Sequence, residues 1–259
     1  MSTRQRDVII SATDVLRHEP IGKRIRAEVD AITVVDTTEA VLVWEPRRLL
    51  CEYAVPESAL DATLRPHDTA ADPAPPAEGL VFPGVPFVAH TADGEALDVQ
   101  VGDRLLAGAA FRPADPDLAG LVVLDFDAFD SWRHEDELNI GHPRDPYHRL
   151  DTFAGSRRVR VEYDGTVIAD STRPTVLFEA MLPPRYYLPR EDVRVELTPT
   201  DTSTVCTYKG RASYWSARVG TTDLTDVAWG YLEPLADSRE IAGMVCFDDS
   251  QVQVHAESS

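Results

Sequence analysis

Lys209 is one of only two lysines in this chain, and arginine supplies the other positive side chains. A lysine retained in an arginine-biased chain is of interest because a primary amine can lose its proton or attack a carbonyl, whereas a guanidinium does neither. Tyr208 lies directly before it and adds a phenol that can exchange a proton. We predict Lys209 and Tyr208 as the candidate catalytic residues; the alternative is an ordinary surface lysine.

Aromatic and cationic residues are frequent in the same half of the chain. Several rings together with one lysine and one arginine can hold a flat or anionic small molecule by stacking, cation–π contact and charge. Adjacent residues on a strand point to opposite faces, so one residue of each neighbouring pair is expected in the core. The predicted ligand-binding residues are Arg185, Tyr187, Tyr214, Trp215 and Trp229.

Four other polar residues have a structural interpretation beside a chemical one. Glu179 ends an apolar run, which favours a buried carboxylate paired with an arginine over a general base. Cys206 has no histidine near it in sequence, so a buried inert thiol is favoured over a nucleophile. His142 and His148 could act as acid–base or anion-binding groups. The prolines between them favour a rigid clamp.

No metal and no cofactor are expected from the sequence. The three cysteines, Cys51, Cys206 and Cys246, are widely separated and give neither a disulfide framework nor zinc-ligand spacing. The stretch Asp125-Phe-Asp127 is the nearest imitation of paired metal-binding aspartates, and we interpret it as a solvated strand edge.

Charge and hydropathy restrict the class of partner. The formal net charge of −19 would repel a nucleic-acid backbone. No apolar stretch approaches the roughly 20 residues that cross a bilayer, and the first residues lack the apolar core of a secretion signal. We therefore expect a cytoplasmic protein with a small-molecule ligand and with neither nucleic acid nor membrane as partner.

Two parts of the chain repeat one another. Residues 157–179 align without a gap on residues 23–45. With small shifts, further matches place Tyr187 on Tyr53, Lys209 on Pro83, Trp215 on Ala89 and Trp229 on Phe111. We predict two copies of one domain, residues 15–138 and 157–256, joined by a clamp at residues 139–156. The first copy is interpreted as degenerate, and the copies as an internal pseudo-dimer about a pseudo-two-fold axis.

Short runs that alternate in period two predict an all-β fold with minor helix. One such run covers residues 157–163 and is followed by the hairpin signal Asp164-Gly165. Helix is expected only near residues 175–181 and 129–138. The segment 68–78, rich in proline, alanine and acid, is expected to be an exposed loop.

Five motifs are long and distinctive: residues 142–149, 156–162, 178–187, 206–215 and 228–231. Through these motifs the chain resembles the bacterial and fungal domain-of-unknown-function 427 family, which sometimes carries a nucleotidyltransferase-like label. The resemblance covers essentially the whole chain, and the family includes tandem members. It implies a compact fold resembling the β-tent group and supplies no established activity. The family usually has proline where this chain has Thr207, which removes no reactive group.

The leading functional hypothesis is metal-independent binding, or conversion, of a small metabolite in the second copy. One alternative is a protein-interaction or scaffolding module that presents its aromatic residues on a flat patch. The other is a phosphate-transfer enzyme of the nucleotidyltransferase kind, which would need divalent metal and carboxylate ligands.

Overall fold

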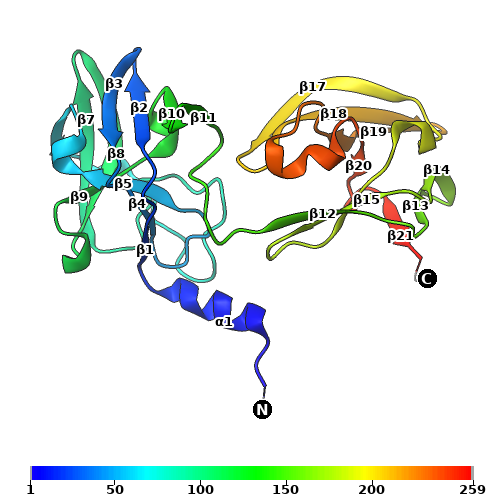
Figure 1. The fold of residues 1–259 in the computed structure, drawn as a ribbon, viewed down its shortest axis with the longest axis horizontal. Helices are drawn as coiled ribbons and strands as arrows, with labels where there is room; N and C mark the ends of the chain where they lie inside the picture. Colours follow the sequence, from blue (N-terminus) through cyan, green and yellow to red (C-terminus); the bar gives the residue numbers. More distant parts are fainter. Residues whose placement is uncertain (1, 258–259) are drawn as a thin grey trace. The chain divides into compact units, whose positions relative to one another are not determined.

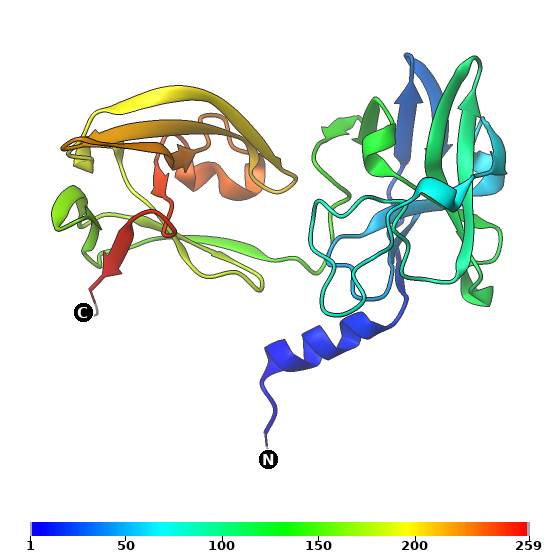
Figure 2. The same ribbon diagram turned by 180° about the vertical axis from the view of Figure 1, so that it is seen from behind.

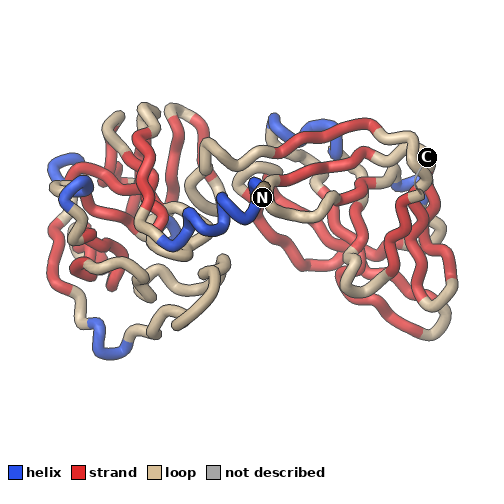
Figure 3. The backbone as a smooth tube through the Cα atoms, turned by 90° about the horizontal axis from the view of Figure 1, so that it is seen from below, coloured by secondary structure: helices blue, strands red, loops and turns tan. Residues whose placement is uncertain are grey.

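Antiparallel β-sheets form most of the structure, a computed structural model that describes residues 2–257. The chain divides after Asp145 into two compact units, called here unit one and unit two. Strands dominate each of them, and helices are short (Figures 1 and 3). The predicted all-β class is confirmed.

Unit one opens with the helix α1 (Gln5–Ser11), which buries none of its residues. A seven-stranded sheet has the order β1-β4-β5-β9-β8-β7-β6, and a four-stranded sheet has the order β11-β10-β2-β3. The strands are β1 (Arg17–Pro20), β2 (Ile25–Val29), β3 (Ile32–Thr37), β4 (Val41–Trp44), β5 (Glu52–Pro56), β6 (Thr63–Pro66), β7 (Gly94–Val101), β8 (Arg104–Pro113), β9 (Leu121–Leu124), β10 (Ser131–His134) and β11 (Glu137–Asn139).

Strand periodicity explains the core of unit one. On β2, Ile25, Ala27 and Val29 are buried and the residues between them are half-buried. Every residue of β4 is buried because this strand has apolar clusters on both faces. Trp132 fills the larger cluster and donates its indole N–H to the Phe126 carbonyl over 2.9 Å, which satisfies its one polar atom.

Unit two contains three sheets, with the orders β12-β15-β16, β14-β13-β21 and β17-β18-β19-β20 (Figure 2). Its strands are β12 (Leu150–Ala154), β13 (Val159–Tyr163), β14 (Thr166–Ser171), β15 (Thr175–Glu179), β16 (Arg185–Tyr187), β17 (Leu197–Cys206), β18 (Gly210–Val219), β19 (Thr222–Gly230), β20 (Cys246–Phe247) and β21 (Gln253–Ala256).

The strand pairings of unit two follow those of unit one in chain order. The series β12-β15-β16 corresponds to β1-β4-β5, β14-β13-β21 to β3-β2-β10, and β17-β18-β19-β20 to β6-β7-β8-β9. The register of β2 on β3 shifts between Ala27 and Glu28, and that of β13 on β14 shifts between Val161 and Glu162. These are matched positions of the gapless sequence alignment.

Side-chain contacts repeat at the same positions. The guanidinium of Arg24 donates to both carboxylate oxygens of Asp36, and that of Arg158 donates to both of Asp170. Asp30 and Asp164, which begin the two hairpin turns, have positive φ angles of 51° and 45°. Asparagine, aspartate and glycine tolerate this conformation best, which explains why an aspartate occupies each turn.

Both helices expected from the sequence are wrong. Residues 175–179 form β15, which pairs with β12 on one side and β16 on the other. Most of residues 129–138 belong to β10 and β11, whose turn contains Glu135 at a φ of 51°. In each case pairing with neighbouring strands overrides local propensity. The segment 68–78 is a loop with one short 3₁₀ turn, Thr69–Ala71.

His134 makes the stability of unit one dependent on pH. Its Nε2 is hydrogen-bonded to the Tyr53 hydroxyl, which also accepts from Asn139 Nδ2 over 3.1 Å. Burial, with smaller contributions from the positive charges of Lys23 and Arg144, lowers the pKa of His134 to about 4. Between this value and the unfolded pKa of about 6.5, the unfolded chain binds more protons. Stability therefore falls as pH decreases through this window.

Acidification from about pH 6.5 to 4 should destabilise unit one by about 2 kcal/mol through this residue, allowing for partial solvent exposure. Thermal unfolding across that range should show a flatter profile for His134→Gln than for the wild type. The matched control, His255→Gln, removes an exposed histidine and should leave the profile unchanged. Identical profiles for wild type and His134→Gln would contradict the assignment.

Candidate functional site

Four side chains form a compact polar group in unit two, called here the unit-two cluster: His148, Glu179, Tyr208 and Lys209. The Lys209 ammonium donates to Glu179 Oε2, and the side chains of the pair are only 10% and 9% exposed. His148 Nε2 lies 3.1 Å from Glu179 Oε1. The Tyr208 ring stacks on the His148 ring with centroids 4.4 Å apart. The two predicted catalytic residues therefore meet a carboxylate and an imidazole.

Two sharp turns position this ion pair. Glu179 ends β15, and the Leu182 N–H donates to the Glu179 carbonyl over 3.1 Å, with Met181 between them at a φ of 67°. Lys209 lies in the turn between β17 and β18, directly before Gly210, whose φ is 100°. That angle is strained for any residue with a Cβ, so the glycine allows the turn to fold over the end of β15.

The charge balance of the cluster favours an ionised carboxylate. Burial alone would raise the pKa of Glu179, but the hydrogen bond with His148 and the charge of Lys209 outweigh it and hold the pKa below its usual value. An ammonium, a carboxylate and an imidazole in contact can hold a proton and pass it between defined atoms. This is acid–base capability that does not depend on a metal ion.

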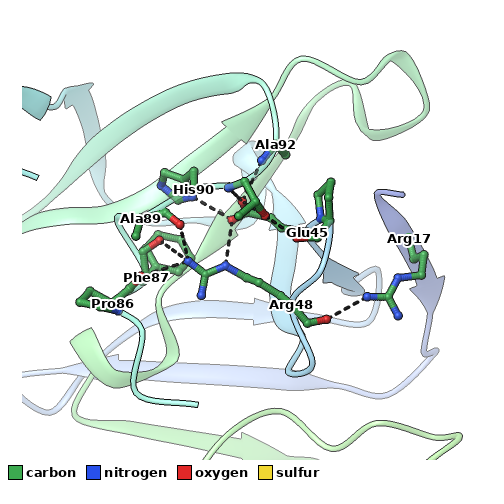
Figure 4. Close-up of polar contacts among 10 residues, drawn as sticks. Arg17, Glu45, Arg48, Pro86, Phe87, Ala89, His90 and Ala92 are labelled. Carbon is green, nitrogen blue, oxygen red and sulfur yellow. Dashed lines mark hydrogen bonds and ion pairs between the residues drawn. The ribbon is translucent and has the colours of Figure 1, made fainter. Parts of the chain in front are cut away.

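Unit one holds a carboxylate at the corresponding place, directly after β4. Glu45 Oε1 lies 2.8 Å from His90 Nδ1, and Oε2 accepts from the backbone N–H groups of Thr91 and Ala92 over 2.5 and 3.1 Å (Figure 4). Arg48 Nε lies 3.9 Å from the carboxylate. Glu45 is 5% exposed and His90 is 9% exposed. Backbone N–H groups thus donate to Glu45 in unit one, whereas the Lys209 ammonium donates to Glu179 in unit two.

Strand register relates the two arrangements and corrects the sequence alignment. Trp229 pairs with Tyr214 as Phe111 pairs with Ala96, in agreement with the predicted match of Trp229 and Phe111. Counting back along β18 and β7 from these pairs puts Lys209 at the position of Thr91. The predicted matches of Lys209 with Pro83 and of Trp215 with Ala89 are therefore wrong, because the long segment between β6 and β7 displaces the register.

Two of the predicted ligand-binding residues lie in the core. Tyr187 is 1% exposed, and burial raises its pKa. Trp215 is 5% exposed and packs in an apolar cluster, with the Arg190 guanidinium 4.0 Å from its ring centroid. Tyr214 packs against a different cluster, and its hydroxyl lies 2.9 Å from Thr204 Oγ1. The two neighbours face opposite ways, as the strand pattern predicts.

Arg185 and Trp229 lie together, and Arg185 borders a small cavity. The Arg185 guanidinium lies 5.5 Å from the Trp229 ring centroid and forms a 2.7 Å ion pair with Asp249. Arg185 also lines a cavity of about 110 Å³, whose wall includes Cys246 and Phe247. Burial raises the pKa of Cys246 to about 12, so its thiol is unreactive at neutral pH.

Several sequence interpretations change in the structure. Glu179 contacts a lysine and a histidine rather than the expected arginine. Cys206 is half-buried rather than buried. Asp125 is half-buried, which raises its pKa, whereas Asp127 is exposed as expected. The expected clamp at residues 139–156 includes β12, which pairs with β15 in unit two. The sequence match of Glu179 with Glu45 was the one indication that these two carboxylates hold equivalent positions. Nothing in the sequence linked His148 to Glu179.

In the comparisons with known proteins, the family match covers unit two and none of unit one. Residues 151–258 match the family model of a domain of unknown function (DUF427), which assigns no activity. The search of curated proteins found no match for the chain. Among residues 2–257, no three His, Cys, Asp or Glu side chains are grouped to hold a metal ion. The described helices are all too short or too polar to cross a membrane.

Proposed function

We propose that this chain is a metal-independent small-molecule-binding protein and that unit two binds a small organic molecule at the unit-two cluster. The observation that carries the proposal is the buried ion pair of Lys209 with Glu179. Unit one places Glu45 in a corresponding turn mainly with backbone N–H groups and His90, so a lysine is not needed to hold that turn. A buried ion pair adds little stability over simpler packing, which favours a chemical role for Lys209.

Two further residues of unit two, Arg185 and Trp229, would supply the rest of the proposed site. Arg185 lines a cavity and lies over the Trp229 ring, and a cation with an indole face suits a flat or anionic ligand. Lys209 would donate as a compact ammonium, Glu179 would accept, and His148 would exchange a proton. Any reaction at the site would rely on these groups.

We also propose that the two units are copies of one domain. The shared order of strand pairings, the matched register shift and the repeated Arg–Asp pairs support this origin. The pseudo-two-fold relation stays a prediction.

Lys209→Arg should abolish ligand-dependent stabilisation while the chain still folds. Arginine keeps the charge but is larger and forked, so overpacking at this buried turn should cost about 1–3 kcal/mol. Thermal unfolding of the wild-type chain should be measured against a library of metabolites, each scored by the rise in Tm. A ligand that stabilises the wild type should fail to stabilise Lys209→Arg and should stabilise Trp229→Phe less.

The second lysine provides the matched control. Lys23 is exposed, and Lys23→Arg should respond to the ligand as the wild type does. Equal stabilisation of the wild type and of Lys209→Arg, or a library without any stabilising compound, would contradict the proposal.

A protein-interaction role is the second candidate, favoured by one observation. Phe153 and Phe178 are 59% and 40% exposed on neighbouring strands, and their ring centroids are 6.1 Å apart. Exposed adjacent aromatic rings are typical of protein contact surfaces. This candidate gains support if no metabolite stabilises the wild-type chain.

A further inference from the structure

Unit one, interpreted from the sequence as degenerate, contains a cavity of about 280 Å³. Its lining is mixed: Leu50, Phe126 and the segment 81–87 are mainly apolar, and the polar residues are Arg48, Glu52, Asp125, Asp127 and His142. A volume close to 300 Å³, with aromatic side chains beside a few convergent polar groups, is compatible with a small-molecule site.

The carboxyl groups of the cavity lie on two adjacent elements. Glu52 begins β5, and its Oε2 accepts from the Phe126 N–H over 3.3 Å. Asp125 lies directly before the 3₁₀ turn Phe126–Ala128, and its Oδ1 accepts from the Asp127 N–H over 3.1 Å. Within residues 2–257, no cationic side chain forms an ion pair with Glu52, Asp125 or Asp127. The acidic wall therefore lacks a counter-charge in contact.

Arg48 lines the same cavity but is engaged elsewhere. Its Nη2 donates to the carbonyl oxygens of Pro86, Phe87 and Ala89 over 3.0, 3.2 and 2.7 Å (Figure 4). Its Nε faces Glu45. The guanidinium thus holds Pro86, Phe87 and Ala89 in place through their carbonyl groups. Its positive charge lowers the pKa of Glu52 and of Asp125, but it offsets only part of the effects that raise them.

The electrostatics agree with this geometry. Burial raises the pKa of Glu52 well above its usual value, and the charge of Asp125 raises it further. Burial also raises the pKa of Asp125, to which the charge of Asp127 contributes. A cation bound between these groups would relieve both effects, because an opposite charge favours ionised carboxylates.

We propose that this cavity binds a small organic cation, in which an ammonium group faces Glu52 and Asp125 and an apolar body fills the walls. The ammonium would donate hydrogen bonds to carboxylate oxygens, and the apolar body would displace water from Phe87 and Phe126. The site differs in place and in charge preference from the one proposed in unit two.

The test compares three probes of similar shape on the full chain by isothermal titration calorimetry: 2-phenylethylamine, 2-phenylethanol and phenylacetate. The amine should bind about tenfold or more tightly than the alcohol, and the anion should not bind. Asp125→Asn and Glu52→Gln should each weaken amine binding by about tenfold. Asp117→Asn, which neutralises an exposed aspartate, should bind the amine as the wild type does.

Lys209→Arg should also bind the amine normally, so the outcome is independent of the site in unit two. Thermal unfolding of each variant establishes that it is folded, and two separate carboxyl variants guard against the loss of one through misfolding. Equal affinity for the amine and the alcohol, absence of amine binding, or unchanged binding in folded Asp125→Asn and Glu52→Gln would overturn the proposal.

Discussion

Lys209→Met should lower the free energy of unfolding of unit two by about 3 to 5 kcal/mol. Methionine has a similar length and no charge, so the substitution removes the ammonium and leaves Glu179 buried with His148 as its remaining side-chain partner. An uncompensated buried carboxylate is costly, and its pKa should rise toward the value that burial alone imposes.

Chemical denaturation of the single and double variants measures this effect. Glu179→Gln combined with Lys209→Met removes both charges and should recover much of the lost stability. Lys23→Met, at an exposed position, should change stability by less than about 0.5 kcal/mol. If Lys209→Met proves as mild as Lys23→Met, the ion pair does not form as described.

Trp215→Ala should also destabilise unit two by about 3 to 5 kcal/mol. Its indole is 5% exposed and packs in a cluster that includes Val161, Leu188 and Val227, so truncation leaves a large cavity. This result would assign the residue to the core, in place of its sequence-based assignment to the ligand site.

Tyr214→Phe provides the comparison from the neighbouring position. It removes only a hydroxyl that lies 2.9 Å from Thr204 Oγ1 at an exposed contact, so stability should change by about 1 kcal/mol or less. A loss below about 1 kcal/mol for Trp215→Ala, accompanied by loss of ligand binding, would instead place the indole in a binding pocket.

Most of the fold prediction rested on the period-two alternation of apolar and polar residues along the strands. Alternation along residues 157–163 and the aspartate in the following turn predict β13 and its hairpin with β14, and both form. The helix predicted at residues 175–179 is wrong because three buried positions in a row suit a strand with neighbours on both sides as well as a helix. Only the pairing with β12 and β16 distinguishes the two, and pairing between distant strands is not written in local sequence.

The residues of the candidate site in unit two were predictable only one by one, because their contacts also join segments that are distant in the sequence. Residue type and rarity drew attention to Lys209, and the repeat drew attention to Glu179, yet the sequence did not connect them. Their contact depends on a turn before β18 folding over the end of β15, and His148 joins from the segment before β12. The cavity of unit one depends on how the segment 81–87 folds, which no periodic pattern reports.

The most direct test of the proposed function uses the fact that the chain has two lysines. A chain labelled with carbon-13 at the lysine ε-carbons should give two NMR signals, assigned by Lys23→Arg and Lys209→Arg. On addition of a stabilising metabolite from the thermal screen, the Lys209 signal should shift or broaden and the Lys23 signal should stay in place. A ligand that binds the folded chain and leaves the Lys209 signal unchanged would contradict a site at the unit-two cluster.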